Sequence, residues 1–234
     1  MAGGSRTKAD YAYRVLRQMI VTGKVPAGQP IEESEFVAII EVGRTPIRES
    51  LKRLAQEQFI RWPAHRTPYV SSLSLEDVHR LYESRMVMEV PAAVLAASRA
   101  TPDQHRMVQE RFEELQHATE EGDVYESIEA DHALHIAITR GSNNKFLTEA
   151  VDRLNCSSLR LWYVAHERSG LATVAQHHED LINALYAGDP DRTEQAVRHH
   201  IRTSYERQIS LHLDGLSALP TSSSQLSRDL PFDG

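Results

Sequence analysis

One aspartate and three histidines in the second part of the chain occur at positions where their side chains could bind a metal ion together. Asp131 and His135 are four residues apart, so in a helix they lie on one face, which they share with apolar residues. His178 lies on the apolar face of another predicted helix, whereas the face of the last helix that carries His200 is less clearly apolar. Each histidine alone is more often a structural residue with an ordinary hydrogen-bond partner. Together, one carboxylate and three imidazoles form a donor set suited to Zn²⁺, Ni²⁺ or Mn²⁺.

Arg85 is a second candidate for chemistry in the same part of the chain. It falls on a helical stripe with Val78, Leu81 and Met88, so we expect its guanidinium to face the interior. An inward arginine near a metal ion could bind a small organic acid through paired hydrogen bonds. The alternative is an internal ion pair with Glu89, four residues further along, and the sequence does not separate the two.

The elements that would position these residues are helices. From Ser74 onward the apolar residues recur with helical period, and no convincing strand is found. Helix start signals occur at Ser74, which begins a capping-box-like sequence, and at Thr101, which is followed by proline. The predicted helices are roughly 75–99 with an interruption near Pro91, 102–121, 123–140, 143–167, 171–187 and 190–213. This pattern predicts an all-α bundle of six to seven helices.

Charge divides the chain into two parts. Residues 1–70 contain 11 Lys and Arg and 7 Asp and Glu, whereas residues 71–234 contain 15 and 26. Eleven of the twelve histidines also lie in the second part. The net charge of −7 for the whole chain argues against nucleic-acid binding, but the basic first part is compatible with it.

The basic part follows the pattern of a winged helix-turn-helix. A first helix that contains residues 15–20 is followed by predicted helices at 34–41 and 45–57. A small hairpin with strands at 59–62 and 68–71 follows them. The fold class expected for the whole chain is therefore mostly α, with this unit in front of the helical bundle.

The third of these helices has an apolar side and a basic side. Its inward apolar stripe leaves Thr45, Arg48 and Lys52 on the opposite side, and Arg44 precedes them. These side chains offer donors for guanine edges and phosphates in a major groove. Charge spacing alone is equally compatible with an ordinary solvated face.

The run Val42–Leu54, VGRTPIRESLKRL, closely resembles the recognition-helix signature of GntR-family transcription regulators. The resemblance implies that this helix contacts operator DNA and that the wing at residues 64–67 reaches towards the adjacent minor groove. The residues it assigns to DNA are Arg44, Thr45 and Arg48 in the helix, with His65 and Arg66 in the wing. We expect Lys52 to face a phosphate or solvent.

Three positions depart from the family pattern. Glu41 stands where the family usually has glycine in the turn, and Gly43 stands where it usually has serine, a better helix cap. Thr67 stands where the wing tends to have glycine. The resemblance still implies the fold, but it does not imply a particular operator sequence.

The helical part resembles the FCD ligand domain that follows the winged helix in the FadR group of GntR regulators. In that domain an Asp-x-x-x-His motif is followed by a histidine that opens His-x-x-(Ile/Leu)-(Leu/Ile)-x-Ala and by a histidine in the final helix. The matching residues are Asp131, His135, His178 and His200. The resemblance implies that they hold a divalent transition metal, with water or a small carboxylate effector completing its shell and Arg85 as an effector-binding residue.

The sequence therefore predicts a DNA-binding domain at 1–73, a metal- and effector-binding domain at 74–213 and a flexible tail at 214–234. The expected function is a transcriptional regulator, a repressor rather than an activator, whose binding to double-stranded operator DNA is modulated by a small organic acid; the sequence does not tell whether the acid releases or promotes binding. Two half-sites read by a homodimer would give an inverted-repeat operator.

Two other functions remain open at this stage. A metal-dependent hydrolase or lyase could use the same side chains, but it lacks an evident general acid or base beyond the ligands. A regulator that senses the metal ion itself differs only in its effector. The lone Cys156 and the absence of a long apolar stretch predict a cytoplasmic protein without a membrane segment.

Overall fold

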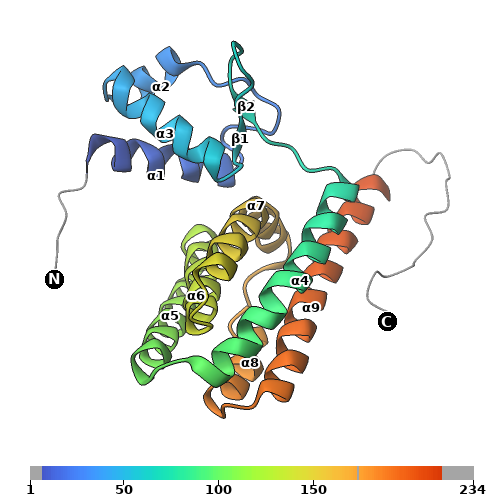
Figure 1. Cartoon of the computed structure of the whole chain (residues 1–234). Helices are drawn as coiled ribbons and strands as arrows, with labels where there is room; N and C mark the ends of the chain where they lie inside the picture. Colours follow the sequence, from blue (N-terminus) through green and yellow to red (C-terminus); the bar gives the residue numbers. More distant parts are fainter. Residues whose placement is uncertain (1–6, 173, 218–234) are drawn as a thin grey trace.

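The computed structural model describes residues 7–172 and 174–217, which form two helical units (Figure 1). The N-terminal unit contains α1 (Lys8–Val21), α2 (Glu33–Ile40), α3 (Arg44–Gln56) and the short strands β1 (Ile60–Arg61) and β2 (Tyr69–Val70). The second unit contains α4 (Leu75–Arg99), α5 (Pro102–Glu121), α6 (Val124–Gly141), α7 (Lys145–Ser169), α8 (Gln176–Tyr186) and α9 (Pro190–Ser217). The predicted fold class, a winged helix-turn-helix followed by an all-α bundle, is confirmed.

The N-terminal unit is built around the apolar stripe of α3. This stripe packs against α1, and its residues are completely buried. The strands are antiparallel, with Ile60 opposite Val70 and Arg61 opposite Tyr69, and the segment between them is the wing. The central core residues of this unit are Leu16, Ile20, Ile47, Leu51 and Leu54.

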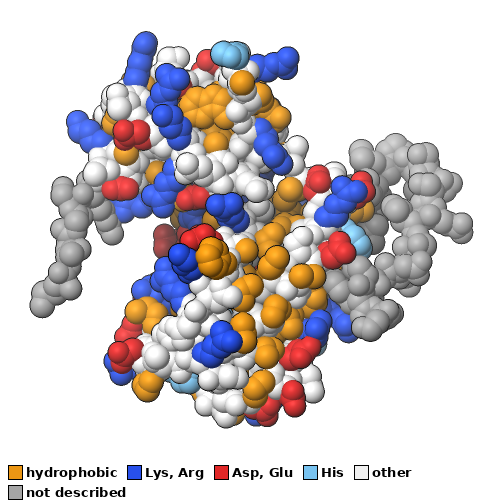
Figure 2. Space-filling model, viewed as in Figure 1, with side chains coloured by type: hydrophobic (Ala, Val, Ile, Leu, Met, Phe, Trp, Pro, Cys, Tyr) orange, Lys and Arg blue, Asp and Glu red, His pale blue; other side chains and the backbone are white. Residues whose placement is uncertain are grey.

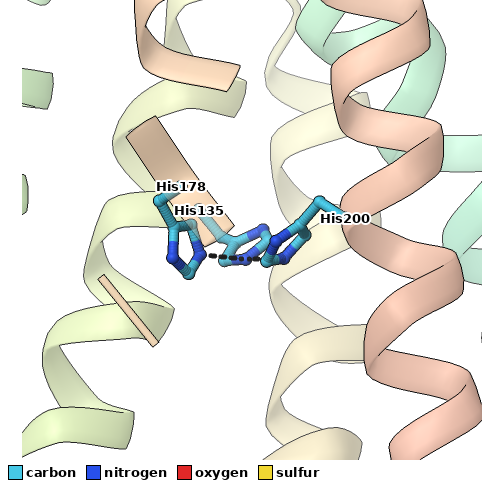
Figure 3. A group of neighbouring side chains, drawn as sticks. All are labelled: His135, His178 and His200. Carbon is cyan, nitrogen blue, oxygen red and sulfur yellow. Dashed lines mark hydrogen bonds between the residues drawn. The ribbon is translucent and has the colours of Figure 1, made fainter. Parts of the chain in front are cut away.

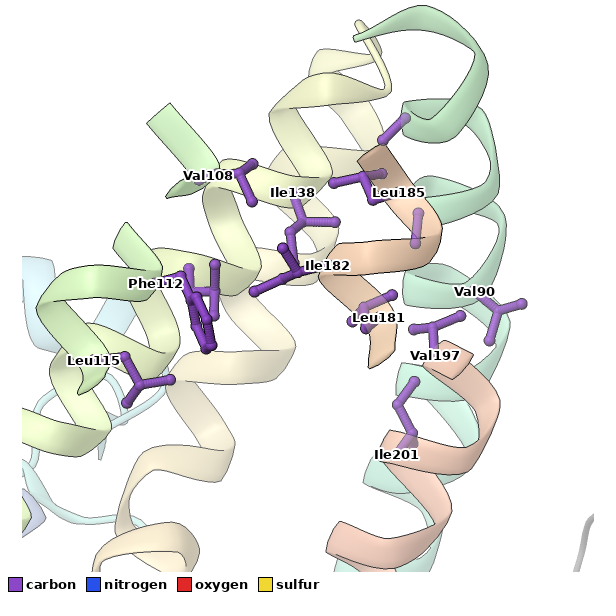
Figure 4. Close-up of a cluster of buried hydrophobic side chains, with 14 of the residues drawn as sticks. Val90, Val108, Phe112, Leu115, Ile138, Leu181, Ile182, Leu185, Val197 and Ile201 are labelled. Atoms are coloured by element: carbon purple, nitrogen blue, oxygen red, sulfur yellow. The ribbon is translucent and has the colours of Figure 1, made fainter. Parts of the chain in front are cut away.

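In the bundle, α4 packs against α9 and also contacts α6 and α7, while α5 packs against α6 (Figure 1). Capping boxes at Ser74 and Thr101 fix the starts of α4 and α5, as the sequence predicts. Gly141 lets α6 approach α4 closely, because a Cβ atom there would lie 3.0 Å from the Cβ of Ala96. Figure 4 shows part of the shared apolar core, including Phe112, Ile138, Ile182, Leu185 and Ile201.

Three predicted helix boundaries were wrong. Pro91 does not interrupt α4. Proline has no N–H group, so the carbonyl group of Val87 loses its helical hydrogen-bond donor. Because Pro91 lies on the exposed side of the helix, water can satisfy that carbonyl group. The helix predicted at 171–187 begins only at Gln176, although Leu171 and Val174 are buried as expected. The last helix extends to Ser217 and so includes the start of the predicted tail; residues 218–234 lie outside the described residues.

The two units are in direct contact. Ile128 of α6 and Cys156, Leu159 and Trp162 of α7 belong to the same buried apolar cluster as the core of the N-terminal unit. Beside them, Arg17 of α1 forms an ion pair with Glu129 of α6. No helix among the described residues combines the length and the apolar character needed to cross a lipid bilayer.

The turn between α2 and α3 predicts an effect on stability. Glu41 adopts the left-handed conformation, with φ 58° and ψ 37°, which strains an L-residue that has a Cβ atom. We expect Glu41→Gly to raise the free energy of unfolding by about 0.5–1 kcal/mol, because relief of strain exceeds the added entropy of the unfolded chain. Urea denaturation would measure the change.

The matched control is Glu49→Gly on the exposed side of α3, where the backbone is helical. This variant should lower the free energy of unfolding by about 1 kcal/mol. Equal destabilisation by both substitutions would contradict the role assigned to Glu41.

Candidate metal centre and nucleic-acid interface

Three histidine rings from three helices meet in the interior of the bundle (Figure 3). His135 belongs to α6, His178 to α8 and His200 to α9. The Nε2 atom of His135 lies 3.5 Å from Nε2 of His178 and 3.2 Å from Nε2 of His200. All three side chains are buried, and their ligand-capable nitrogens lie within 4.8 Å of one another.

The Asp131 carboxylate lies at the same point. Its Oδ1 atom is 2.8 Å from Nε2 of His178 and 3.6 Å from Nε2 of His135. Despite these short distances, this buried oxygen has no contact with hydrogen-bond geometry among the described residues. The Asp131 oxygen is therefore not aligned with an N–H bond of a histidine ring. Instead, the carboxylate oxygen and the imidazole nitrogens face a common space. The structure thus brings together all four residues that the sequence nominated as metal ligands.

The charges in this cluster compensate one another. Burial alone would raise the pKa of the Asp131 carboxyl, but the surrounding imidazoles, with His178 foremost, together outweigh burial and lower that pKa. Burial likewise opposes protonation of His178, yet the Asp131 carboxylate raises the pKa of its ring. Burial, together with the neighbouring imidazoles, holds the pKa of His200 well below its usual value. His200 is therefore neutral at pH 7 and keeps a lone pair available to a ligand.

Two of the three outer ring nitrogens have partners that the sequence pattern did not indicate. Nδ1 of His135 lies 2.9 Å from Oε2 of Glu89, a buried residue of α4. Nδ1 of His178 lies 2.9 Å from the backbone carbonyl oxygen of Val174. A proton on each outer nitrogen leaves the Nε2 lone pair directed inward, as metal ligation requires. Nδ1 of His200 is buried without a partner among the described residues.

Arg85 is completely buried and pairs with Glu89. Its Nε atom donates to Oε1 at 2.5 Å and its Nη2 atom donates to Oε2 at 3.4 Å. Burial would raise the pKa of Glu89, but Arg85 and His135 outweigh it and lower that pKa to about 2. The ion pair held as the alternative is therefore present. Arg85 does not line the cavity beside the histidines, and its role in effector binding remains a prediction.

A small cavity lies directly beside the histidine cluster. On α9, Ser204 and Arg207 line it, and Nη2 of Arg207 is 3.1 Å from Nδ1 of His177. Neither residue was among the predicted site residues, although they follow His200 by four and seven positions and so share its helical face. The complete lining is Asp131, Trp162, His166, Val174, His177, His178, His200, Ser204 and Arg207.

A second concave surface lies between α3 and the wing. Arg44 and Arg48 from the start of α3, and His65 and Arg66 from the wing, line one hollow. The other two residues predicted to contact DNA, Thr45 and Lys52, are exposed on α3 but do not line it. Figure 2 shows several Lys and Arg side chains on the visible face of this N-terminal unit. A protruding wing beside a helix with basic residues fits the two grooves of a DNA duplex.

The arginine at the centre of this surface is only weakly held. Nε of Arg48 lies 3.9 Å from Oε1 of Glu33, and its guanidinium carbon lies 6.0 Å from the ring centroid of Trp62. An exposed ion pair at this distance contributes little free energy, so a phosphate or a base edge could replace it. At the wing tip it is His65, with φ 59°, and not Thr67 that adopts the left-handed backbone conformation.

Two curated proteins that resemble this chain in sequence are named as transcriptional repressors. The chain is 28% identical over 185 residues to the probable D-xylose utilization operon transcriptional repressor of Paenarthrobacter nicotinovorans, covering 78% of this chain and 80% of that protein. It is 27% identical over 200 residues to the HTH-type transcriptional repressor RspR of Escherichia coli strain K12, covering 84% and 88%.

Solved structures share the fold. Escherichia coli McbR/YncC superposes with a TM-score of 0.74 at 20% identity, covering 88% of this chain and 99% of that one. A putative GntR transcriptional regulator from Rhodococcus sp. RHA1 superposes with a TM-score of 0.69 at 19% identity, covering 87% and 98%.

Family matches cover both units. Residues 8–64 match the family of bacterial regulatory proteins named gntR, and residues 80–203, more than half of the chain, match the FCD domain. The related proteins are transcriptional regulators and not enzymes, which argues against the hydrolase or lyase alternative. The chain belongs to the GntR family of transcriptional regulators and carries an FCD domain behind its winged helix-turn-helix.

Proposed function

We propose that this protein is a transcriptional repressor that binds operator DNA as a homodimer and responds to a small carboxylate effector at a metal centre in its FCD domain. The observation that carries the proposal is the convergence of Asp131, His135, His178 and His200 in the interior of the bundle. Two relatives named as repressors support repression rather than activation.

The four side chains fit a divalent transition metal. They offer three imidazole nitrogens and one carboxylate oxygen, a set suited to Zn²⁺, Ni²⁺ or Mn²⁺. Oδ1 of Asp131, buried without a hydrogen bond among the described residues, is the oxygen that an ion would satisfy. The contacts of Glu89 and of the Val174 carbonyl with the outer nitrogens orient two of the rings. When bound, the ion would supply positive charge and coordination positions for an oxygen ligand.

The cavity beside the cluster supports a small carboxylate as effector. Arg207 contributes a guanidinium group and Ser204 a hydroxyl group to its lining. An arginine binds a carboxylate through paired, charge-assisted hydrogen bonds. The small size of this cavity favours a short organic acid. Arg85 pairs with Glu89, so it would act on the effector only through that ion pair.

The exposed side of α4 supports a homodimer. Val87 is 62% exposed and Met88 is 36% exposed, and exposed Pro91 follows one turn later. Figure 2 shows hydrophobic side chains along this region of the molecule. A contiguous apolar stripe on a long helix is a surface that a second copy could cover about a twofold axis. Such a dimer would present two copies of α3 to an inverted-repeat operator.

The metal centre predicts a response of thermal stability to metal ions. In chelator-treated protein, Zn²⁺, Ni²⁺ or Mn²⁺ at about 100 times the dissociation constant should stabilise the fold by about 2.7 kcal/mol. His178→Ala should abolish this stabilisation because it removes a ligand. His177→Ala is the matched control, since this neighbouring ring contacts Arg207 and not the cluster. A metal response that His178→Ala leaves intact would refute the centre.

The DNA-facing surface predicts different roles for two basic residues of α3. Arg48→Ala should weaken binding to the DNA upstream of the protein's own gene by about 1–3 kcal/mol. Lys52→Ala should instead lower the slope of log affinity against log salt concentration by about one, as expected for a phosphate contact. Fluorescence anisotropy at several salt concentrations would measure both effects.

Arg106→Ala is the control for these measurements, because Arg106 lies on α5 and pairs with the exposed Asp103. It should leave the affinity and its salt dependence unchanged. If Arg48→Ala did not change the DNA affinity, or if that affinity did not depend on salt concentration, the assignment of α3 to DNA binding would be wrong.

The apolar stripe predicts the site of dimerisation. A double variant, Val87→Glu with Met88→Glu, should convert a dimer into a folded monomer, because it places two carboxylates in the interface. Light scattering after size-exclusion chromatography would measure the mass. Met107→Glu changes another exposed apolar residue, on α5, and should leave the dimer intact. A double variant that remains dimeric would place the interface elsewhere.

A further inference from the structure

A cavity of about 480 Å³ lies where the two domains meet. One wall is formed by the end of α1, the loop that follows it, β1 and the linker at residues 71–73. The other wall is formed by α7 and α9. Its volume falls within the range of small-molecule sites. It shares no lining residue with the cavity beside the histidine cluster, so the two spaces are distinct.

Three arginines line this cavity, and none of the described residues that line it is acidic. Arg61 comes from β1, and Arg160 and Arg168 come from α7. This local excess of positive charge is unexpected beside a domain in which acidic residues outnumber basic ones. A cavity with this charge favours an anion over a neutral or cationic ligand.

Arg160 is the arginine that most clearly lacks a partner. Its Nη1 atom is buried and has no hydrogen-bond partner among the described residues. Burial lowers the pKa of Arg160, and no carboxylate in the part of the chain that the structure describes offsets this effect. A buried guanidinium nitrogen without an acceptor is costly, and an anionic oxygen would satisfy it.

The rest of the wall is mainly apolar. Apolar side chains from both domains face the same space, and the other polar groups are serine hydroxyls from the linker and α7 and the amides of Gln58 and Gln208. The larger apolar residues are Ile20, Phe59, Leu73, Leu161, Val164 and Leu211. A ligand that buried a hydrocarbon body here would gain free energy in proportion to the apolar area removed from water.

We propose that this interdomain cavity binds an organic anion with an apolar body, its acidic group held by Arg160 with Arg61 and Arg168, as a second ligand site independent of the metal centre. A ligand in this position contacts α7, β1 and the linker at once. The affinity of the cavity for this ligand therefore depends on the orientation of the DNA-binding domain relative to the FCD domain. This dependence is the condition for coupling ligand binding to DNA binding.

The test uses the full-length protein and the fluorescent anion 8-anilinonaphthalene-1-sulfonate as probe. We expect saturable one-site binding, and competition by octanoate and benzoate. Arg160→Met, which keeps a long apolar side chain, should weaken dye binding by about tenfold through loss of a charge-assisted hydrogen bond. Arg153→Met is the matched control, since Arg153 is exposed on the same helix and lies outside the cavity lining.

Two further measurements locate the site. Cys156, the single cysteine of the chain, lines the cavity, so bound octanoate should slow its modification by methyl methanethiosulfonate. His178→Ala, which disables the metal centre, should leave dye binding unchanged. If Arg160→Met does not fold, Arg168→Met at an exposed position provides the same comparison.

Either of two results would overturn the proposal. One is unchanged dye affinity in the folded arginine variants together with an unprotected Cys156. The other is loss of dye binding in His178→Ala, which would place the anion at the histidine cluster. Because these outcomes do not involve metal-dependent stability, they are independent of the test of the metal centre.

Discussion

The bundle is organised around the burial of one carboxylate, that of Asp131. An ionised carboxylate inside a protein costs several kcal/mol unless opposite charges or hydrogen-bond donors compensate it. Here the compensation comes chiefly from His178 on α8, with His135 on the same helix as Asp131. The neutral ring of His200 on α9 contacts His135, with their Nε2 atoms 3.2 Å apart. A displacement of α8 would leave the carboxylate without its main partner. The cluster therefore constrains how α6, α8 and α9 pack, and the same convergence makes it suited to a cation.

A second layer of charge connects this cluster to α4. The Glu89 carboxylate lies between two hydrogen-bonding partners, the guanidinium group of Arg85 and the imidazole ring of His135. Arg85 is completely buried and stacks near the rings of Tyr82 and Trp162, at 5.0 and 4.8 Å from their centroids. Since α4 follows the linker from the DNA-binding domain, the helix that supports the histidine cluster is also the first element of the FCD domain.

The contact between the two domains gives this connection a physical basis. The apolar cluster of the DNA-binding domain continues into α6 and α7 through Ile128 and Trp162. Trp162 also donates from Nε1 to the hydroxyl oxygen of Tyr82 at 3.2 Å, which links α7 to α4. The proposed interdomain ligand site lies along the same boundary. The relative placement of the domains is therefore set by packed side chains as well as by the linker.

Much of this molecule follows from the sequence by itself. Helical periodicity, the capping boxes at Ser74 and Thr101 and the apolar stripe of α3 are local properties, because residues three and four apart meet on any helix. The same periodicity placed Asp131 and His135 on one inward face. Helical phase together with a motif indicated His178, and mostly a motif indicated His200. Both lie on other helices, so local spacing alone could not connect them to Asp131 and His135. The tertiary structure decided the features that depend on contacts between distant segments. These are the meeting of the Nε2 atoms, the contact of Glu89 with His135 and the cavity between the domains. It also decided that Arg85 pairs with Glu89 and does not face the cavity beside the histidines. These features are absent from the sequence pattern because the free energy of a buried charge depends on which distant groups surround it, and only packing determines them.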